Sequence, residues 1–314
     1  SGANGFSASG LHFPADEIAG TGRDDRLSLL PASGDAVPSN DHPAFSYGNW
    51  GVFIRGGAML GDQKNDFEQP GYNFTNTEVA IGTDYRFTSK FVAGVMVGVN
   101  TSRAKLDDAG SVMKMEGFSV GAYGTYYTGG FFLDGQLGYG MNTYQNVRRI
   151  VFPGLDRTAS SDPTGALFSA YGGTGYDVRL GNWLITPQVS LLYTTLAIAG
   201  YDETGADSLN LSVERQSAKS LQSIAGGRIS YRWETAFATM TPSCNLAYIH
   251  EFNNDSREVS ARLTQLGIPF SIHTASASAN FAQAGAGVMG ELKNGMVLSL
   301  DYGVQFGQGG YLAH

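Results

Sequence analysis

The sequence has few charged residues and one cysteine, and each shortage excludes a class of protein. Charged side chains make up 15% of the 314 residues, whereas the surface of a soluble domain normally carries more. The single cysteine, Cys244, excludes an intramolecular disulfide and a cysteine-based zinc site. The composition therefore argues against an ordinary soluble domain and against a small domain held together by disulfides or zinc.

Long hydrophobic runs are also missing. A membrane-spanning helix needs about 18 to 20 consecutive apolar residues, and the longest candidate, residues 91–99, is far shorter. The formal net charge is −8, and no part of the sequence concentrates the basic residues that phosphate binding requires. A helical membrane protein is thus excluded, and no nucleic-acid partner is expected.

Glycine and aromatic residues are abundant instead, with 43 Gly, 16 Tyr and 18 Phe, which is typical of strands separated by turns. From Trp50 onward, runs of ten or more residues alternate strictly between apolar and polar side chains. In residues 131–143, for example, Leu133 and Leu137 fall on one face while Asp134 and Gln136 fall on the other. A period of two residues predicts β-strands with one apolar and one polar face.

Strand length separates a membrane barrel from a soluble sandwich. Soluble strands average about five or six residues, whereas a tilted strand needs about 9 to 11 to cross a bilayer. The polar faces here are rich in Gly, Ser, Thr and Asn, as in a crowded wet interior. Aromatic residues such as Trp183, Tyr231 and Trp233 gather near strand ends, where a transmembrane barrel has its aromatic girdles.

The connections alternate between short and long, as in bacterial outer-membrane barrels. The short turns are expected at 88–90, 128–130, 180–182, 234–235 and 293–295, on the periplasmic side. The long loops are expected outside the cell, near 61–73, 106–111, 148–165, 199–216 and 253–276. The strands predicted between them are 47–60, 74–87, 90–105, 112–127, 130–147, 166–179, 182–198, 217–233, 235–252, 277–292 and 295–306.

A closed single-chain barrel is expected to have an even number of strands, so one more is needed. Residues 3–13 are a candidate for a twelfth strand, placed between 295–306 and 47–60 to remove the sheet edges. The sequence then divides into a strand that completes the barrel (1–13), a connector or pore segment (14–45) and the transmembrane barrel (46–314). The predicted fold is an all-β, twelve-stranded antiparallel barrel in the outer membrane of a Gram-negative bacterium, with lipid or detergent around it.

No motif assembles a nucleophile, a base and an orienting group, so no catalytic residue is assigned. Asp207-Ser208-Leu209 superficially resembles a serine esterase block but lacks the preceding glycine and falls in a predicted surface loop. The histidines show no metal-ligand spacing, and neither a metal nor an organic cofactor is expected. They are His12, His42, His250, His273 and His314. Cys244 shares the apolar face with Leu246 and is expected to face lipid.

The charged residues that the alternation places on the inner face form the most interesting set. They are Arg55, Glu78, Asp84, Arg86, Asp134, Asp177, Arg179, Arg228, Arg232, Glu251 and Asp301. Cross-strand pairing of opposite charges would stabilise a wet interior. Selective binding of an ion or of a threading polypeptide is the alternative role.

Several segments resemble the translocator domain of bacterial autotransporters, in an order and spacing that span most of the chain from residue 51. They are Phe91-Val92-Ala93-Gly94-Val95, Gly117 to Gly124, Phe131 to Gly135, Gly200 to Ala206, Ser220-Leu221-Gln222-Ser223, Tyr248 to Phe252 and Leu300 to Phe306. The resemblance implies an outer-membrane barrel of type V secretion, monomeric and without enzymatic activity of its own. A passenger polypeptide and the barrel-assembly machinery are the partners it implies.

Members of this family end in a strand with a terminal aromatic residue, and Leu11-His12-Phe13 looks like that ending. The sequence therefore reads like a circular permutant opened in the last surface loop, or like a chain that lost its real last strand. Two functions follow as alternatives: export or surface anchoring of a passenger, and a standalone pore or structural barrel without one. A segment from 14–45 inside the interior would favour the first, and an open interior the second.

Overall fold

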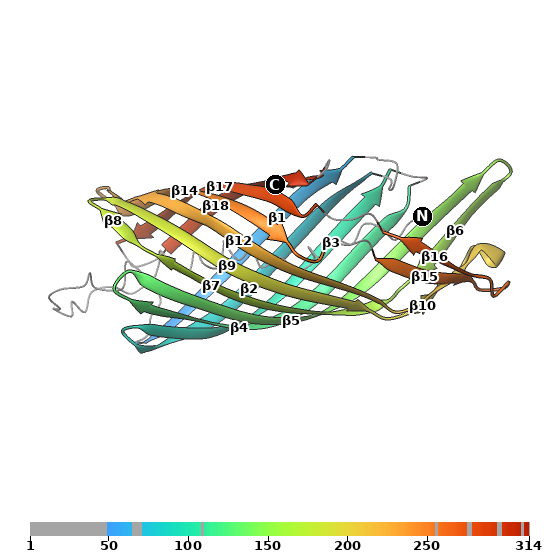
Figure 1. Ribbon diagram of the computed structural model, residues 1–314, viewed down its shortest axis with the longest axis horizontal. Coiled ribbons are helices and arrows are strands. Elements are labelled where there is room, and N and C mark those ends of the chain that lie inside the picture. Colours follow the sequence, from blue (N-terminus) through green and yellow to red (C-terminus); the bar gives the residue numbers. More distant parts are fainter. Residues whose placement is uncertain are drawn as a thin grey trace.

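The computed structural model describes residues 49–64, 71–107, 110–254, 257–274, 278–293, 297–308 and 311–313. Nearly all of these residues lie in antiparallel strands that curl into a barrel-like sheet (Figure 1). The long strands are β1 (Trp50–Gln63), β2 (Tyr72–Thr88), β3 (Phe91–Leu106), β4 (Val112–Thr128), β5 (Phe131–Phe152), β7 (Thr164–Tyr176), β9 (Trp183–Ile198), β12 (Gln216–Tyr231), β14 (Ala238–Glu251), β17 (Asn280–Leu292) and β18 (Val297–Gln308).

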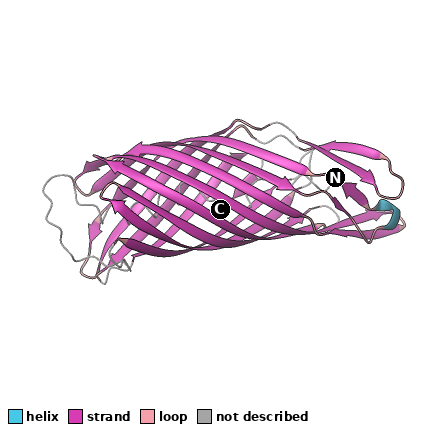
Figure 2. Cartoon of the chain, turned by 90° about the horizontal axis from the view of Figure 1, so that it is seen from below, coloured by secondary structure: helices cyan, strands magenta, loops and turns pink. Residues whose placement is uncertain are grey.

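Each long strand pairs with the next long strand along the chain, from β1 through β18. A short strand, β19 (Tyr311–Ala313), then pairs with both β18 and residues 61–63 of β1, so the pairings return to the first strand. Figure 2 shows the strands wrapping obliquely around a common axis. Between β1 and β18, backbone groups are paired from strand to strand along the long strands, whereas the return contact to β1 involves only residues 61–63 within the described part of the chain.

The eleven long strands predicted from the alternation are confirmed in the described residues, with ends displaced by a few residues. The predicted strand over 3–13 and the connector over 14–45 lie outside the described residues. The circular permutation and the total of twelve strands therefore stay predictions. Within the described part, β19 adds three residues at the place between β18 and β1 where the twelfth strand was expected.

Exposure alternates along most of the long strands, most regularly on β1 to β5, in the sense expected of a membrane barrel. Large apolar side chains such as Ile54 (77% exposed), Met141 (60%) and Leu300 (74%) project outward. Their neighbours on the other face are buried or half-buried and are often polar, as with Gln136 and Asn142 on β5. A soluble sheet would bury the apolar face, so this sheet has the polarity of a membrane barrel.

The long connections contain more regular structure than the sequence predicted. β5 continues through residue 152 and turns back as β6 (Leu155–Ser161), where a loop over 148–165 was expected. Beyond the same end of the barrel, a separate four-stranded sheet contains β10 (Tyr201–Asp202), β11 (Leu211–Val213), β15 (Glu258–Leu263) and β16 (Pro269–His273). Figure 1 shows this outer sheet beside the β5–β6 hairpin.

The remaining short elements are β8 (Val178–Leu180), β13 (Trp233–Glu234) and the 3₁₀ turn η2 (Asp207–Leu209). Asp177 alone separates β8 from β7, and both pair with β9. β13 closes the tight turn into β14 through Thr235, whose hydroxyl donates to the carbonyl oxygen of Ala238 at 2.6 Å. The short turns predicted at this end of the barrel near 180–182 and 234–235 are thus confirmed.

Aromatic rings on the inner face lie over glycines of neighbouring strands. The ring of Phe132 covers Gly175, and a Cβ placed on Gly175 would also come within 2.5 Å of the carbonyl oxygen of Pro187. The ring of Phe53 covers Gly82 in the same way. Phe132 is 1% exposed, so the missing side chains leave the space that these rings fill.

The substitution Gly175→Ala should lower the free energy of unfolding by about 1–3 kcal/mol, because the new methyl group must displace Phe132 or the backbone of β9. Gly135→Ala is the matched control, since nothing lies within 4 Å of a Cβ at Gly135, and its effect should stay within about 0.5 kcal/mol. Urea unfolding of the refolded barrel in detergent measures both. Equal stability of the two variants would contradict the packing described.

Leu137→Arg tests the direction of the apolar face. Leu137 is 56% exposed and lies midway along residues 131–143, the part of β5 that pairs with β7, and an arginine at the bilayer midplane of a barrel costs about 2–4 kcal/mol. Thr128→Arg, at the end of β4, should cost about 0–1 kcal/mol because that position is close to the interface. The measurement is urea-dependent folding into lipid vesicles. If Leu137→Arg lowers the free energy of unfolding no more than Thr128→Arg does, this face does not contact hydrocarbon.

Candidate functional site in the charged interior

Four of the predicted inner charges form a network of alternating sign. Arg55 of β1 lies 3.7 Å from Glu78 of β2, and Arg228 of β12 lies 3.8 Å from Asp301 of β18. Arg55 also interacts electrostatically with Asp301, which joins the two pairs. Because β14 and β17 lie between β12 and β18 in the sheet, the second pair links strands that are not neighbours.

Glycine makes room for this network. A Cβ on Gly287 of β17 would collide with the carboxylate of Asp301. The side chain of Asp301 therefore extends along the wall over a neighbouring strand that carries no side chain at that position. This arrangement brings charges together that are far apart in the sequence.

Three other predicted carboxylates are held by hydrogen bonds. Glu251 accepts from Ser220 Oγ at 2.5 Å, and also from the backbone N–H groups of Leu221 and Asn253 at 2.9 Å. Asp177 accepts from the Thr186 hydroxyl at 2.6 Å, and Asp84 from the Tyr123 hydroxyl at 3.1 Å. These contacts fix the ends of strands and give the carboxylates a structural role.

The structure places the predicted set at different degrees of burial. Asp177 and Glu251 are buried; Arg55, Glu78, Asp84, Arg86, Asp134 and Arg228 are half-buried; Arg179, Arg232 and Asp301 are exposed. Arg232 pairs with Glu234 at 3.4 Å near the short turn after β12, so its partner is local. That all eleven residues line the interior stays a prediction.

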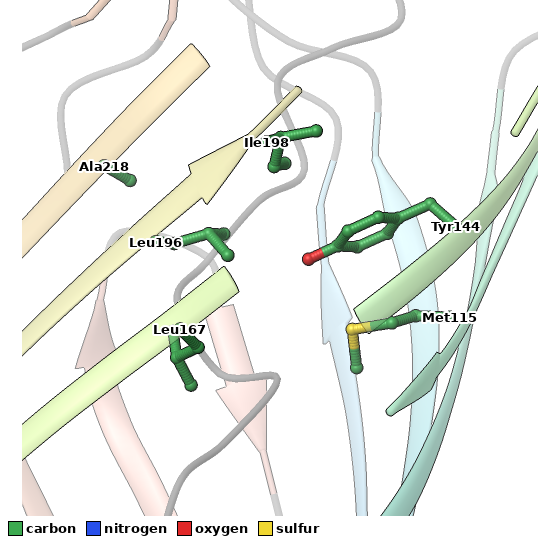
Figure 3. Packing of buried hydrophobic residues seen from close by; sticks show 6 residues of the cluster. All are labelled: Met115, Tyr144, Leu167, Leu196, Ile198 and Ala218. Atoms are coloured by element: carbon green, nitrogen blue, oxygen red, sulfur yellow. The ribbon is translucent and has the colours of Figure 1, made fainter. Parts of the chain in front are cut away.

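Part of the inner face is apolar, which the alternation of polar and apolar residues did not predict. Met115, Tyr144, Leu167, Leu196, Ile198 and Ala218 form a buried cluster on β4, β5, β7, β9 and β12 (Figure 3). A second cluster contains Leu192, Ile224, Ala247, Ile249 and Phe281. The signal was present in the sequence, because residues 192–198 of β9 carry apolar side chains at inward positions, opposite to the alternation used elsewhere.

An ion pair between Arg148 and Glu203 connects the segment that follows β10 to strand β5 of the barrel. The guanidinium of Arg148 on β5 donates to both carboxylate oxygens of Glu203, at 2.9 and 2.5 Å, and to the carbonyl oxygen of Leu209 at 2.9 Å. Glu203 also accepts from the backbone N–H of Leu211. Burial, with the nearby Glu203 carboxylate, raises the pKa of Tyr201 to about 12, so that this hydroxyl stays protonated.

Catalytic groups do not converge in the described part of the chain. Ser208 lies in the exposed turn η2, where Asp207 has a positive φ of 53° and pairs with Arg157. His250 bonds to Asn280 at 2.8 Å and His273 lies on β16, so neither histidine is bonded to Ser208. No group of three or more potential metal ligands occurs among the residues described. The site offers charge and hydrogen bonding.

No helix in the described ranges is long and apolar enough to cross a bilayer.

Long antiparallel strands, an outward apolar face and a charged inner face together define an outer-membrane β-barrel. The family model of the autotransporter β-domain matches residues 52–303. The chain therefore belongs to the autotransporter β-domain family, the outer-membrane translocator domains of type V secretion in Gram-negative bacteria. The β-domain is the barrel part of an autotransporter and is not itself catalytic.

Similar proteins agree with this assignment. The chain is 26% identical over 233 residues to Esterase EstA of Pseudomonas aeruginosa, covering 70% of this chain and 34% of that protein. The fold is similar to the translocator domain of autotransporter NalP from Neisseria meningitidis, with a TM-score of 0.64 and 16% identity over 96% of this chain and 93% of that one. The transport unit of autotransporter AIDA-I from Escherichia coli gives a TM-score of 0.61 and 16% identity, over 93% and 95%.

The chain thus spans about a third of the length of EstA, the curated relative that it matches over 233 residues. The two structural relatives, in contrast, are covered almost entirely. The matched region is the barrel, and the similarity to solved structures concerns the fold.

Glu251→Gln should destabilise the barrel by about 1–3 kcal/mol. Both carboxylate oxygens of Glu251 accept hydrogen bonds, and the NH₂ group that replaces one of them cannot accept, so a buried hydrogen bond is lost. Glu234→Gln is the control: Glu234 is 75% exposed and pairs only with Arg232, so its effect should be within about 0.5 kcal/mol. Thermal conversion of folded to unfolded barrel, followed by gel mobility, compares the two. Equal melting temperatures would show that Glu251 does not hold this strand end.

Proposed function

We propose that this chain supports the export or surface anchoring of a passenger polypeptide across the outer membrane. The observation that carries the proposal is the mixed inner face, which combines the charge network of Arg55, Glu78, Arg228 and Asp301 with the apolar cluster around Tyr144. A polypeptide presents backbone polar groups, charges and apolar side chains together. An inner face lined only by polar and charged side chains would suit an ion or a small solute better.

The positions of the charge network and of the apolar cluster around Tyr144 support the export of a polypeptide. The charges that form the network come from β1, β2, β12 and β18, whereas the cluster around Tyr144 lies on β4 to β12 near the long-loop end. A threading chain would therefore meet charges of both signs at one part of the inner face and apolar side chains at another. Weak contacts with many groups allow movement, because no single site binds too tightly to release the chain.

We infer three kinds of partner. Lipid or detergent covers the outward apolar face, a passenger polypeptide passes through or is held at the interior, and the barrel-assembly machinery inserts the chain into the membrane. We expect the barrel to act as a monomer. Membership of the autotransporter β-domain family supports these partners, since the domain is the membrane part of longer proteins.

The test is surface display. The chain would be expressed in a Gram-negative host with a signal peptide and an epitope placed ahead of Ser1, and antibody binding to intact cells would be measured. A translocator should expose the epitope on a large fraction of cells. Leu137→Arg, which should prevent insertion, supplies the negative control, and Glu234→Gln supplies a control with a folded barrel.

A standalone pore or structural barrel is the alternative function. In that case the epitope should remain in the periplasm while the purified barrel conducts ions steadily in planar bilayers. If the wild-type barrel folds and inserts but never exposes the epitope, the export proposal is wrong. Conductance measured on the same preparation then shows whether the pore explanation takes its place.

A further inference from the structure

The outward face of β2 to β5 changes polarity in rows that run across neighbouring strands. One row consists of Val79, Val99, Phe118 and Met141, which are paired from strand to strand and 47–60% exposed. The next row toward the long loops is Thr77, Thr101, Glu116 and Thr143, and the following row is Thr75, Arg103, Lys114 and Gln145. The apolar band therefore ends between the first two rows.

The third row contains an unfavourable pairing. Arg103 of β3 and Lys114 of β4 are directly opposite each other, both exposed, and Lys105 follows two positions beyond Arg103 on the same face. Like charges that are directly opposed destabilise a strand pair unless something neutralises them. In a chain with a net charge of −8, these three exposed cations form a local patch of the opposite sign, which attracts anions.

The protein itself does not supply such an anion. Glu116 lies one row nearer the apolar band and Asp107 lies beyond Lys105, yet neither forms an ion pair with the three cations. Within the described ranges, no carboxylate lies within 4 Å of Arg103, Lys105 or Lys114. The basic patch, defined as these three residues, is thus open to an external anion.

The height of the basic patch relative to the bilayer indicates that its anion is part of a lipid headgroup. Four residues separate Val99 from Arg103, or about 13 Å along the strand and about 10 Å along the membrane normal at a tilt near 40°. The cations therefore lie just above the hydrocarbon, in the headgroup layer. They are on the long-loop side, where the outer leaflet of a Gram-negative bacterium presents the phosphorylated glucosamine headgroup of lipid A.

We infer that the basic patch binds the phosphate groups of lipid A in the outer leaflet. The guanidinium of Arg103 can donate two hydrogen bonds to one phosphate, and the ammonium groups of Lys105 and Lys114 act as point charges beside it. The acyl chains would lie along Val79, Val99 and Phe118 below. One lipid molecule would then satisfy both the apolar row and the charged row.

The experiment measures lipid A binding to the refolded full chain in detergent by native mass spectrometry. The triple variant Arg103→Gln, Lys105→Gln and Lys114→Gln should bind diphosphorylated lipid A at least about tenfold more weakly than the wild type. Lys219→Gln is the matched control, because Lys219 is also exposed near the outer end of its strand but stands apart from the patch. Heat-dependent gel mobility establishes that each variant is folded.

Two further ligands separate the sources of binding. Lipid A without phosphates should bind the wild type as weakly as it binds the triple variant, and inorganic phosphate alone should not compete at millimolar concentration. Equal binding of diphosphorylated lipid A by the wild type and the triple variant would overturn the proposal. So would equal binding of the phosphorylated and dephosphorylated lipids by the wild type, since acyl contacts alone would then account for the complex.

Discussion

Every other feature of this barrel depends on the satisfaction of backbone hydrogen bonds between neighbouring strands. In hydrocarbon an unpaired N–H or C=O group costs several kcal/mol, so only a sheet without open edges is stable there. The described strand pairings run from β1 to β18, and the three-residue strand β19 connects β18 back to residues 61–63 of β1. Once this ladder is formed, successive side chains must face alternately lipid and interior, and the charges, rings and glycines take their positions from that alternation.

The interior differs from a uniform water-filled channel. Charged residues from β1, β2, β12 and β18 meet near Arg55 and Asp301, while two apolar clusters occupy other parts of the inner face, one on β4 to β12 and one on β9 to β17. Glycines opposite large side chains let those side chains lie along the wall. The result is a wall able to make many weak contacts with a flexible chain, as the proposed export of a polypeptide requires.

Outside the membrane the structure is more regular than a set of loops. The β5–β6 hairpin, the turn η2 and the outer sheet are connected by Arg148, Glu203 and a small apolar cluster that includes Ile150 and Ala206. At the boundary of the membrane, the outward rows on β2 to β5 pass from apolar to cationic within a few residues. The lipid-facing wall therefore changes from apolar to polar and charged side chains at the height where the proposed lipid headgroup would lie.

The sequence by itself determined the strands, their alternation and the family, because a period of two residues over long runs is a local property that survives without knowledge of contacts. The same alternation predicted that Arg55, Glu78, Arg228 and Asp301 lie on the inner face. Only the tertiary structure decided that these four interact and that Leu196 and Tyr144 meet inside the barrel. It also decided that residues 148–161 form a hairpin and that Arg103 faces Lys114. Those facts depend on strand register, which joins residues distant in the chain and leaves no local periodic signal.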